Sequence, residues 1–385
     1  MKFLHLGDLH LGKSLGDFDL TDDQKYILDE ILQIIKDKEA DAVLIAGDVY
    51  DRAVPSEAAT NLLDFFLKSL ADLKVTTFVI SGNHDSDDRL NYGSSLFESN
   101  GIYINSIYNG QLYKKTMEDE YGEADVYLLP FVKASGVKRL FPDEEINSYE
   151  DAVRVILNHA DIDPKRRNIL IAHQFVAGKN SDPELAGSEG LSVQSVGTVE
   201  KIGYSIFDDF DYVALGHIHG PQQVGRETVR YAGSPLKYSL SEVNNAKSVP
   251  LVEIKQKGEV ETELIPLKPL RDLRHIKGTL KQLLSPENVT DPEDYIYATI
   301  TDEEIINDAM AIFQQFYPNT VKLEYENSHT KELSSTDITR FQREKSFEEI
   351  IKEFYEMVYG SGISEEEMAL MKDAAKKAGV ADETD

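Results

Sequence analysis

The sequence contains no cysteine. This absence excludes a disulfide framework and any metal site built on thiolates. No segment approaches the roughly 20 consecutive apolar residues of a membrane helix. The opening segment MKFLHLGDLH carries one lysine, and Asp8 interrupts its apolar stretch, so it does not resemble a signal peptide. We therefore expect a soluble cytoplasmic protein that makes no membrane contact.

Basic residues are scarce as well. The 385 residues include 40 Lys and Arg against 69 Asp and Glu, which gives a formal net charge of −29. Such a charge repels nucleic acids at long range. A polyanionic substrate would need local help from metal ions or from basic clusters such as Lys165, Arg166 and Arg167. For a DNA substrate, the charge predicts strong salt sensitivity or dependence on a partner.

The length predicts more than one domain, because a single core seldom grows past roughly 250–300 residues. Short apolar runs alternate with amphipathic segments in the first half, which is typical of α/β architecture. These runs are Phe3–Leu6, Ala42–Ala46, Thr77–Ile80, Val126–Leu129, Ile169–Ala172 and Tyr212–Leu215. A helix is predicted from a capping box at Thr21 and Gln24, and a second one from Ser56.

The pattern of apolar residues changes in the second half of the sequence. Residues 226–267 predict strands and hairpins that extend the first domain. Residues 271–335 contain a strand, a helix-like segment over 302–316 and another strand, and the chain after residue 341 is predicted to be helical. We predict a first domain at 1–270, a small α+β domain at 271–340 and a helical tail at 341–385.

Five of the apolar runs end in Asp, Asn or His. In α/β sheets, ligands bind outside the carboxyl ends of the strands, so strands in one sheet would gather these side chains at one edge. Residues two apart past a strand end can face the same cleft. The side chains are Asp8 and His10, Asp48, the triplet Asn83, His84 and Asp85, then His173, and finally His217 and His219.

Oxygen and imidazole ligands without sulfur suit divalent ions such as Mn²⁺, Fe²⁺ or Zn²⁺. One Asp after a strand is usually a turn residue, so the prediction depends on all five motifs occurring together. Seven of these nine side chains as ligands would exceed the needs of one ion and would suit two ions that share a carboxylate. Asp48 is the predicted bridge, because a carboxylate has two oxygens. Two ions about 3.5–4 Å apart can clamp the attacking and leaving oxygens of a phosphoryl displacement.

The motif order D-x-H, G-D, G-N-H-D, H and G-H-x-H resembles that of the calcineurin-like dinuclear metallophosphoesterases. The longer segments LIAGDVYDRAVPS, DYVALGHIHGPQ and YAGSPLKYSLSE resemble the SbcD family, the nuclease subunits of bacterial SbcCD complexes. This resemblance implies the α/β (α+β) fold class, with a two-sheet β-sandwich flanked by helices. It also implies a small α+β capping domain, a C-terminal helical tail, and a place in the second sheet for the β-rich stretch after His219.

The resemblance further implies two ligand sets. One ion would be held by Asp8, His10, Asp48 and His219, and the other by Asp48, Asn83, His173 and His217. His84 would face the scissile phosphate, where an imidazole can stabilise developing charge or protonate the leaving oxygen. Asp85 either orients His84 or forms a turn. Asp51 is interpreted as a turn residue, or as one that orients a ligand or holds Arg52 near the substrate path.

The implied activity is that of a DNA nuclease that prefers Mn²⁺, acting as a duplex-end exonuclease and a single-strand endonuclease in DNA repair, recombination and replication. The implied partner is an SbcC-type coiled-coil ATPase, bound by a homodimer within a heterotetramer. Helical spacing of Phe347, Ile350, Phe354 and Val358 offers an apolar face for that partner. The alternative is that this helix packs on its own domain.

Two other functions stay open from the sequence. A phosphatase or phosphodiesterase of the same superfamily that acts on small substrates would not need the residues after 270. A non-catalytic subunit that tethers DNA ends would not need seven ligands and His84.

Overall fold

The computed structural model of the protein describes residues 1–179, 182–185, 201–328, 348, 351–352, 355 and 362–377. The chain divides into two compact units, Met1–Arg274 and His275–Asp385. The predicted boundaries at 270 and 340 stay predictions. The tail residues Phe347, Ile350, Phe354 and Val358 lie outside the described residues, as does the segment that carries most of the predicted helix over 346–358. No helix of the described residues is long and apolar enough to cross a membrane.

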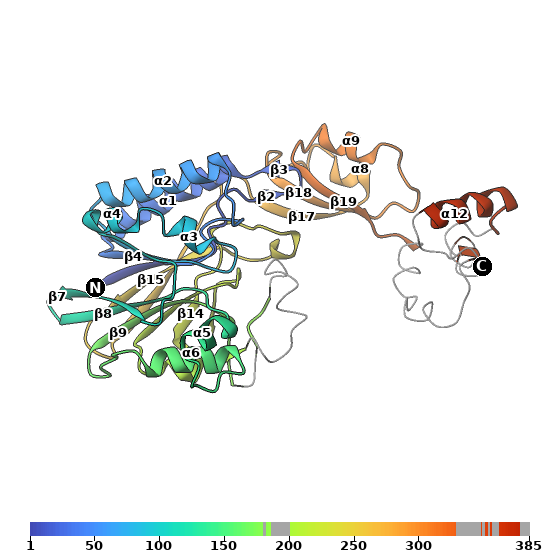
Figure 1. Cartoon of the computed structure of the whole chain (residues 1–385). Coiled ribbons are helices and arrows are strands. Elements are labelled where there is room, and N and C mark those ends of the chain that lie inside the picture. The colour runs from blue at the N-terminus through green and yellow to red at the C-terminus, as the bar shows by residue number, and fades with distance from the viewer. Residues whose placement is uncertain are drawn as a thin grey trace. The chain divides into compact units, whose positions relative to one another are not determined.

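The first unit contains two six-stranded sheets (Figure 1). The first sheet has the order β16 (Val260–Pro266), β15 (Ser248–Ile254), β1 (Lys2–Leu6), β4 (Ala42–Ala46), β5 (Thr76–Ile80) and β6 (Ile102–Asn105). The second has the order β13 (Gln222–Val224), β14 (Arg226–Tyr231), β12 (Tyr212–Gly216), β9 (Arg167–His173), β8 (Gly122–Leu129) and β7 (Tyr113–Asp119). Strands β1, β4, β5 and β6 are parallel, and so are β14, β12, β9 and β8.

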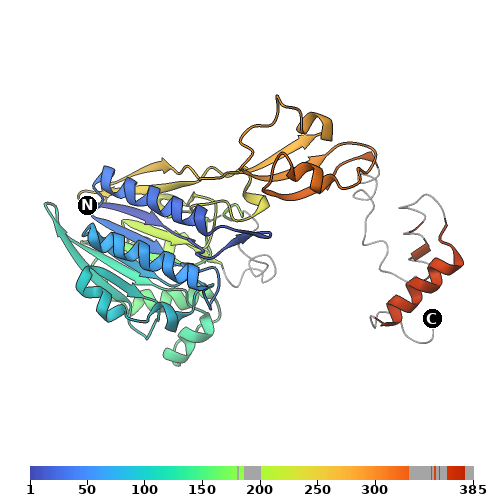
Figure 2. The same cartoon turned by 90° about the horizontal axis from the view of Figure 1, so that it is seen from above.

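Helices cover the outer faces of both sheets. Figures 1 and 2 show α1 (Thr21–Lys38) and α2 (Glu57–Asp72) lying along the first sheet, while α5 (Ala134–Leu140) and α6 (Tyr149–Asn158) lie on the side of the second. Two short helices, α3 (Asp87–Leu90) and α4 (Ser94–Phe97), and the 3-10 turn η1 (Glu98–Asn100) follow β5. The remaining short elements are β2 (Ser14–Leu15), β3 (Phe18–Asp19), β10 (Val176–Ala177), β11 (Ile202–Gly203), η3 (Tyr204–Phe207) and η4 (Leu240–Glu242).

Apolar side chains fill the space between the sheets. Strands buried on both faces read as nearly continuous apolar runs, and all five residues of β4 are buried. One core cluster joins the facing sides of the two sheets, with Phe3, Leu44 and Phe78 from the first and Ile169 and Tyr212 from the second. A second cluster joins the outer face of the second sheet to α5 and α6. The six predicted apolar runs all lie in strands of this sandwich.

Two local predictions are wrong. Thr21 is the first residue of α1, its helix cap is Leu20, and that end has no side-chain cap. The reason is that Gln24 is used elsewhere, since it accepts from Gly12 N at 2.9 Å and donates to His10 O at 2.7 Å. The β-rich stretch after His219 is divided, because β13 and β14 join the second sheet but β15 pairs with β1 in the first.

The second unit contains a three-stranded sheet in the order β17 (Leu273–Gly278), β18 (Tyr295–Ile300) and β19 (Thr320–Tyr325), with β18 and β19 parallel. Helices α8 (Leu280–Leu283) and α9 (Ala309–Gln314) contribute Leu283 and Phe313 to its core. Within the helix-like segment 302–316 the α-helix is limited to α9, which begins only after Asp308 because that residue has a left-handed backbone with φ 54°. Farther along, α12 (Glu365–Lys377) matches the helical prediction for the end of the chain.

Candidate metal centre

The candidate ligands follow five parallel strands that belong to two sheets. Asp8 and Asp48 follow β1 and β4 of the first sheet, whereas His173 and His217 follow β9 and β12 of the second. The two edges are joined by a hydrogen bond in which the backbone N–H of His217 donates to the side-chain carboxylate of Asp8 at 2.9 Å. The expectation of one sheet edge is therefore wrong, because the site lies where the carboxyl ends of two sheets meet.

The backbone at this junction adopts conformations that are uncommon for residues with a side chain. Asp8, His10, Asp48 and His217 have φ values of 52°, 43°, 47° and 102°. Such conformations cost on the order of 1–3 kcal/mol each and persist only where the surroundings hold them. Gln24 holds the His10 carbonyl, and the Tyr238 hydroxyl donates to Leu9 O at 2.6 Å. No sequence pattern predicts this strained backbone, but all four strained residues are candidate ligands.

One group of donors gathers around His10. Its Nε2 lies 3.0 Å from Nε2 of His219, and Asp8, His10 and His219 each offer a ligand atom within 4.8 Å of the others. All three side chains are buried. The arrangement places two imidazole nitrogens and a carboxylate around one point, as a divalent ion requires.

A second group gathers around Asn83. Its Oδ1 lies 2.9 Å from Nδ1 of His217 and 3.0 Å from Nε2 of His173. Asp8, Asp48 and His173 also offer ligand atoms within 4.8 Å of one another. An amide oxygen, two imidazoles and a carboxylate thus form a second set of donors beside the first.

Asp48 lies between the two groups. Its Oδ2 is 3.7 Å from Nε2 of His10 and 3.4 Å from Nε2 of His173. Oδ1 accepts from His84 N at 2.9 Å, and the residue is 2% exposed. The two histidines belong to different groups, so Asp48 has the position that a bridging ligand needs.

Two of the ring nitrogens that face away from the cluster have acceptors. His173 Nδ1 donates to Ala46 O at 2.8 Å, and His219 Nδ1 donates to Glu242 Oε1 at 3.1 Å. Both contacts leave Nε2 as the ring nitrogen directed into the cluster, which is the usual arrangement around metal-bound histidines. Glu242 was missed by sequence reasoning, because nothing in its neighbourhood marks a contact 23 residues away.

The protonation of the cluster suits ligation. Burial lowers the pKa of His10 to about 4 and that of His217 to about 3, so both are neutral imidazoles, the form that binds metals. Burial raises the pKa of Asp8 to about 6. Burial opposes charge on Asp48 and His173 too, but their mutual attraction outweighs it, so the Asp48 pKa falls below its usual range and that of His173 rises to about 9. At neutral pH the His173 ring therefore carries an extra proton beside ionised Asp48. A divalent ion would replace this proton with a stronger positive charge. The donor set therefore fits two divalent ions.

His84 and the acidic residues near it surround this cluster. The His84 ring lies 4.9 Å from that of His10, centroid to centroid, and its Nδ1 is 3.1 Å from Asp51 O. The carboxylate of Asp51 accepts from Lys13 at 2.7 Å and lies 3.5 Å from Nδ1 of His10. His10, Asp51 and His84 also offer ligand atoms within 4.8 Å of one another.

Asp85 has contacts that organise loops. Its carboxylate accepts backbone N–H groups of Gly82, Val49 and Tyr50 at 2.9, 3.0 and 2.9 Å. These contacts match the turn-forming alternative for Asp85, and they tie the loop after β5 to the loop after β4. The Arg52 side chain is 81% exposed, with its Nε 3.7 Å from Asp51 Oδ2.

Comparisons with known proteins give the family. The model of the family described as calcineurin-like phosphoesterase matches residues 1–221, and the one described as type 5 capsule protein repressor C-terminal domain matches residues 269–359. The D subunit of the SbcCD nuclease from Staphylococcus epidermidis is 35% identical over 371 residues, which cover 95% of each chain. The chain belongs to the SbcD family. It is thus a metallophosphoesterase and a homologue of that nuclease subunit over nearly its full length.

Solved structures are more distant. The protein TT1561 of Thermus thermophilus has a TM-score of 0.40 and 13% identity, covering 68% of this chain and 98% of its own. A dimetal phosphatase from Danio rerio has a TM-score of 0.39 and 10% identity, covering 70% of this chain and 98% of its own.

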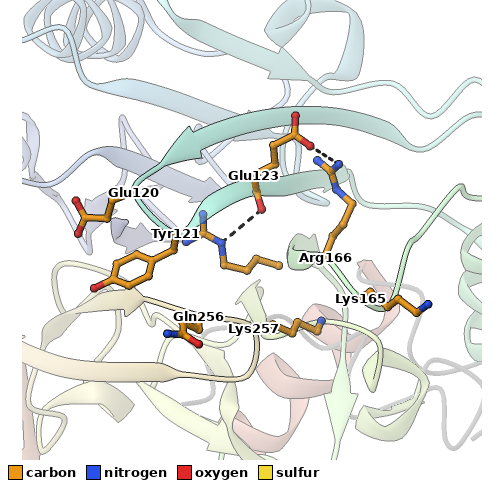
Figure 3. Close-up of a pocket in the computed structure, with 8 residues that line it drawn as sticks. Glu120, Tyr121, Glu123, Lys165, Arg166, Gln256 and Lys257 are labelled. Carbon is orange, nitrogen blue, oxygen red and sulfur yellow. Dashed lines mark hydrogen bonds and ion pairs between the residues drawn. The ribbon is translucent and has the colours of Figure 1, made fainter.

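The basic cluster of this SbcD-family chain lies away from the candidate ligands. Lys165, Arg166 and Arg167 line a pocket of about 570 Å³ where β9 begins, whereas His173 ends that strand (Figure 3). At about 3.3 Å per residue, the seven residues of β9 separate the two places by roughly 20 Å. Arg166 pairs with Glu123 at 2.5 Å. The other ion pairs at this pocket are Arg166 with Asp125, Arg167 with Asp119 and Lys257 with Asp211. The two arginines of the cluster are therefore neutralised locally, and the cluster lies too far from the candidate ligands to offset charge at the site.

Gly216 allows the two sheet edges to approach, and its replacement gives a test of the junction. A Cβ at this position would lie 1.9 Å from Ala46 O and 2.8 Å from Nδ1 of His173. Overpacking typically costs about 1–3 kcal/mol, occasionally more, and the obstacle here is backbone. We expect Gly216→Ala to lower the free energy of unfolding by about 3 kcal/mol, measured by urea denaturation without added metal.

Gly136 is the matched control for this test. It lies in α5, and a Cβ there would meet nothing within 4 Å. Gly136→Ala should raise the free energy of unfolding by about 0.4–1 kcal/mol, because alanine restricts the unfolded chain. Equal stabilities of the two variants would show that the sheet edges are not in close contact at β12.

Proposed function

We propose that this chain is a DNA nuclease that uses two divalent ions, preferably Mn²⁺, and acts as the nuclease subunit of a complex with an SbcC-type ATPase. The observation that carries the proposal is the position of Asp48 between two groups of donors. The full-length similarity to a nuclease subunit supports DNA as the substrate.

The ligands are assigned by the groups in which they lie. Asp8, His10, Asp48 and His219 would hold one ion, and Asp48, Asn83, His173 and His217 would hold the other. When bound, two such ions polarise a phosphodiester and activate a water for attack on phosphorus. The chain's own contribution is a fixed geometry, because six of the seven donors are buried, with Asn83 exposed, and Gln24 and Tyr238 hold the backbone beside His10.

His84 would act on the leaving oxygen. It is only partly buried, unlike His10 beside it. The Asp51 carbonyl accepts from Nδ1 and so fixes the ring, with Nε2 available to a substrate. A positioned imidazole can stabilise charge on the leaving oxygen or protonate it. Asp51 would in addition orient His10, since its carboxylate lies 3.5 Å from the Nδ1 of that ring.

The acidity of the chain bears on its partners. With a net charge of −29, and with Arg166 and Arg167 already in ion pairs, DNA affinity would come from the two ions and from an SbcC-type partner. We propose that the partner binds the chain after residue 341.

We also propose that the chain forms a cytoplasmic homodimer within a heterotetramer. Among the described residues of the first unit, Tyr92 and Leu96 are 86% and 74% exposed, and large exposed apolar side chains suit such an interface.

The test compares two DNA substrates of the same sequence, a linear duplex with free ends and a covalently closed circle. With Mn²⁺ we expect the linear duplex to be degraded and the duplex circle to resist, and EDTA should abolish cleavage. Raising the salt from 50 to 200 mM should reduce the rate steeply unless the ATPase partner is present.

The alternatives predict other outcomes. Hydrolysis of bis-p-nitrophenyl phosphate without cleavage of DNA, even with the ATPase partner, would identify a small-substrate phosphodiesterase. Retention of DNA ends in a gel-shift assay without hydrolysis of either substrate would identify a tethering subunit.

A further inference from the structure

A buried ion pair lies behind His219. Glu242 is 0% exposed and Lys247 is 7% exposed. Their charged groups meet with Nζ of Lys247 2.6 Å from Oε2 of Glu242. Two charges removed from water cost several kcal/mol each unless they are well paired. No other part of the proposed function requires charges here, so their contacts indicate what the pair does.

The hydrogen bonds of this pair all run in one direction. Lys247 can only donate, and it donates to Glu242 Oε2, to Ser234 Oγ at 2.8 Å and to His219 O at 3.0 Å. Ionised Glu242 can only accept, and its Oε1 lies 3.1 Å from Nδ1 of His219. His219 Nδ1 must therefore carry the ring proton. Nε2, which points toward His10, is then the nitrogen available to a metal ion.

We propose that Glu242 and Lys247 are positioning residues that lock His219 in the tautomer whose Nε2 binds metal, and that they thereby set the affinity of one ion. This inference rests on the proposed function, because it takes His219 as a ligand. Glu242 fixes the proton on Nδ1. Lys247 fixes Glu242 in its ionised form and in its orientation, so the pair controls the Asp8, His10 and His219 group and leaves the Asn83 group unaffected.

Glu242→Gln should invert the tautomer. The side-chain amide has one accepting oxygen and one donating NH₂ group. Lys247 needs an acceptor, so the amide oxygen turns toward Nζ and the NH₂ group turns toward His219. Nδ1 then accepts, the proton moves to Nε2, and that nitrogen can no longer bind metal. Loss of such an outer partner typically weakens metal affinity about 10–100-fold, and we expect this loss for one Mn²⁺ while the second binds as before.

A second substitution should reverse this effect. In Glu242→Gln/Lys247→Met the cation is gone, so the amide can turn its oxygen back to His219 Nδ1. Nε2 regains its lone pair, and we expect at least half of the lost affinity, on a logarithmic scale, to return. Glu263→Gln is the control, because Glu263 forms an exposed ion pair with Lys38 at 2.7 Å on the outside of the unit. It should change neither ion.

Two measurements separate this inference from the proposed function. Imidazole ¹⁵N NMR of the metal-free chain reports the tautomer of His219, which should be Nδ1-protonated in the wild type and the double variant and Nε2-protonated in Glu242→Gln. Calorimetric titration with Mn²⁺ reports the number of ions and their affinities, with circular dichroism to verify folding.

The outcomes are distinguishable. A wild-type chain that binds no Mn²⁺ contradicts the proposed function, whereas the NMR experiment still reports which nitrogen carries the proton. A wild type that binds two ions, together with a folded Glu242→Gln that keeps the wild-type tautomer and both affinities, overturns this inference. A folded double variant that stays as weak as Glu242→Gln also overturns it, because Lys247 would then not control the amide.

Discussion

Asp48→Asn is expected to empty both metal positions and to reduce DNA cleavage by on the order of 10³-fold or more, since two ions contribute several kcal/mol to a phosphoryl transfer. The amide is nearly the same shape, and its oxygen can still accept from His84 N, which lies 2.9 Å from Oδ1 in the native site. Its nitrogen would face either His10 or His173 in place of a negative oxygen. In the ligand assignment proposed above, Asp48 is the residue that belongs to both sets, so its replacement removes a donor and a charge from each.

The measurement is metal content per chain after desalting from Mn²⁺, beside single-turnover cleavage of a linear duplex. His10→Ala is the comparison, because it removes a donor from one group and should leave one tightly bound ion. Asp64→Asn is the matched control, since Asp64 is an exposed carboxylate on α2. If Asp48→Asn kept two ions with wild-type affinity, the bridging role would be wrong.

His84→Ala is expected to keep both ions and to lose about 10²–10⁴-fold in the rate of cleavage, the usual contribution of a positioned proton donor. The ring can be removed without moving Asp48, because His84 holds that carboxylate through its backbone N–H. Its ring contacts are with the Asp51 carbonyl and the edge of His10. Metal titration of the variant should therefore match that of the wild type, whereas its rate of DNA cleavage should fall by the factor given above.

The chemical role of His84 can be separated from a steric one with two leaving groups. Protonation matters for the poor sugar-alkoxide leaving group of DNA and matters little for p-nitrophenolate. The defect of His84→Ala should therefore shrink by at least tenfold on bis-p-nitrophenyl phosphate. An equal defect on both substrates would mean that His84 positions the phosphate without protonating it.

The sequence predicts the ligands well because their signal is local. Each of Asp8, Asp48 and His173 follows an apolar run, and a run that becomes a parallel strand delivers its next residues to the carboxyl edge of a sheet. The same local pattern cannot tell which strands share a sheet, so the expectation of one edge was wrong. The pairing of β15 with β1 joins residues some 250 positions apart, and no short pattern encodes that partnership.

The residues that support the ligands could not be predicted for a related reason. Gln24 looks like part of a helix cap, but its side chain holds the backbone of His10 14 residues earlier. Glu242 lies in an ordinary polar segment, and only the folded chain brings it against His219. Asp85 shares its motif with His84, yet its contacts are with three backbone amides. Sequence reports the type of a side chain, whereas its partner depends on the tertiary fold.

The spread of the donors along the chain has a consequence for biosynthesis. His10 and His219 are 209 positions apart, and their nitrogens come together only when strands from both sheets are in place. During translation from the N-terminus, a nascent chain that ends before β12 (Tyr212–Gly216) lacks His217 and His219, one ligand of each set, and cannot complete either metal position. Ions that bind only the finished sandwich stabilise it by mass action. Metal binding would therefore be a late step of maturation. It would stabilise the contact between the two sheets after the last strands have joined them.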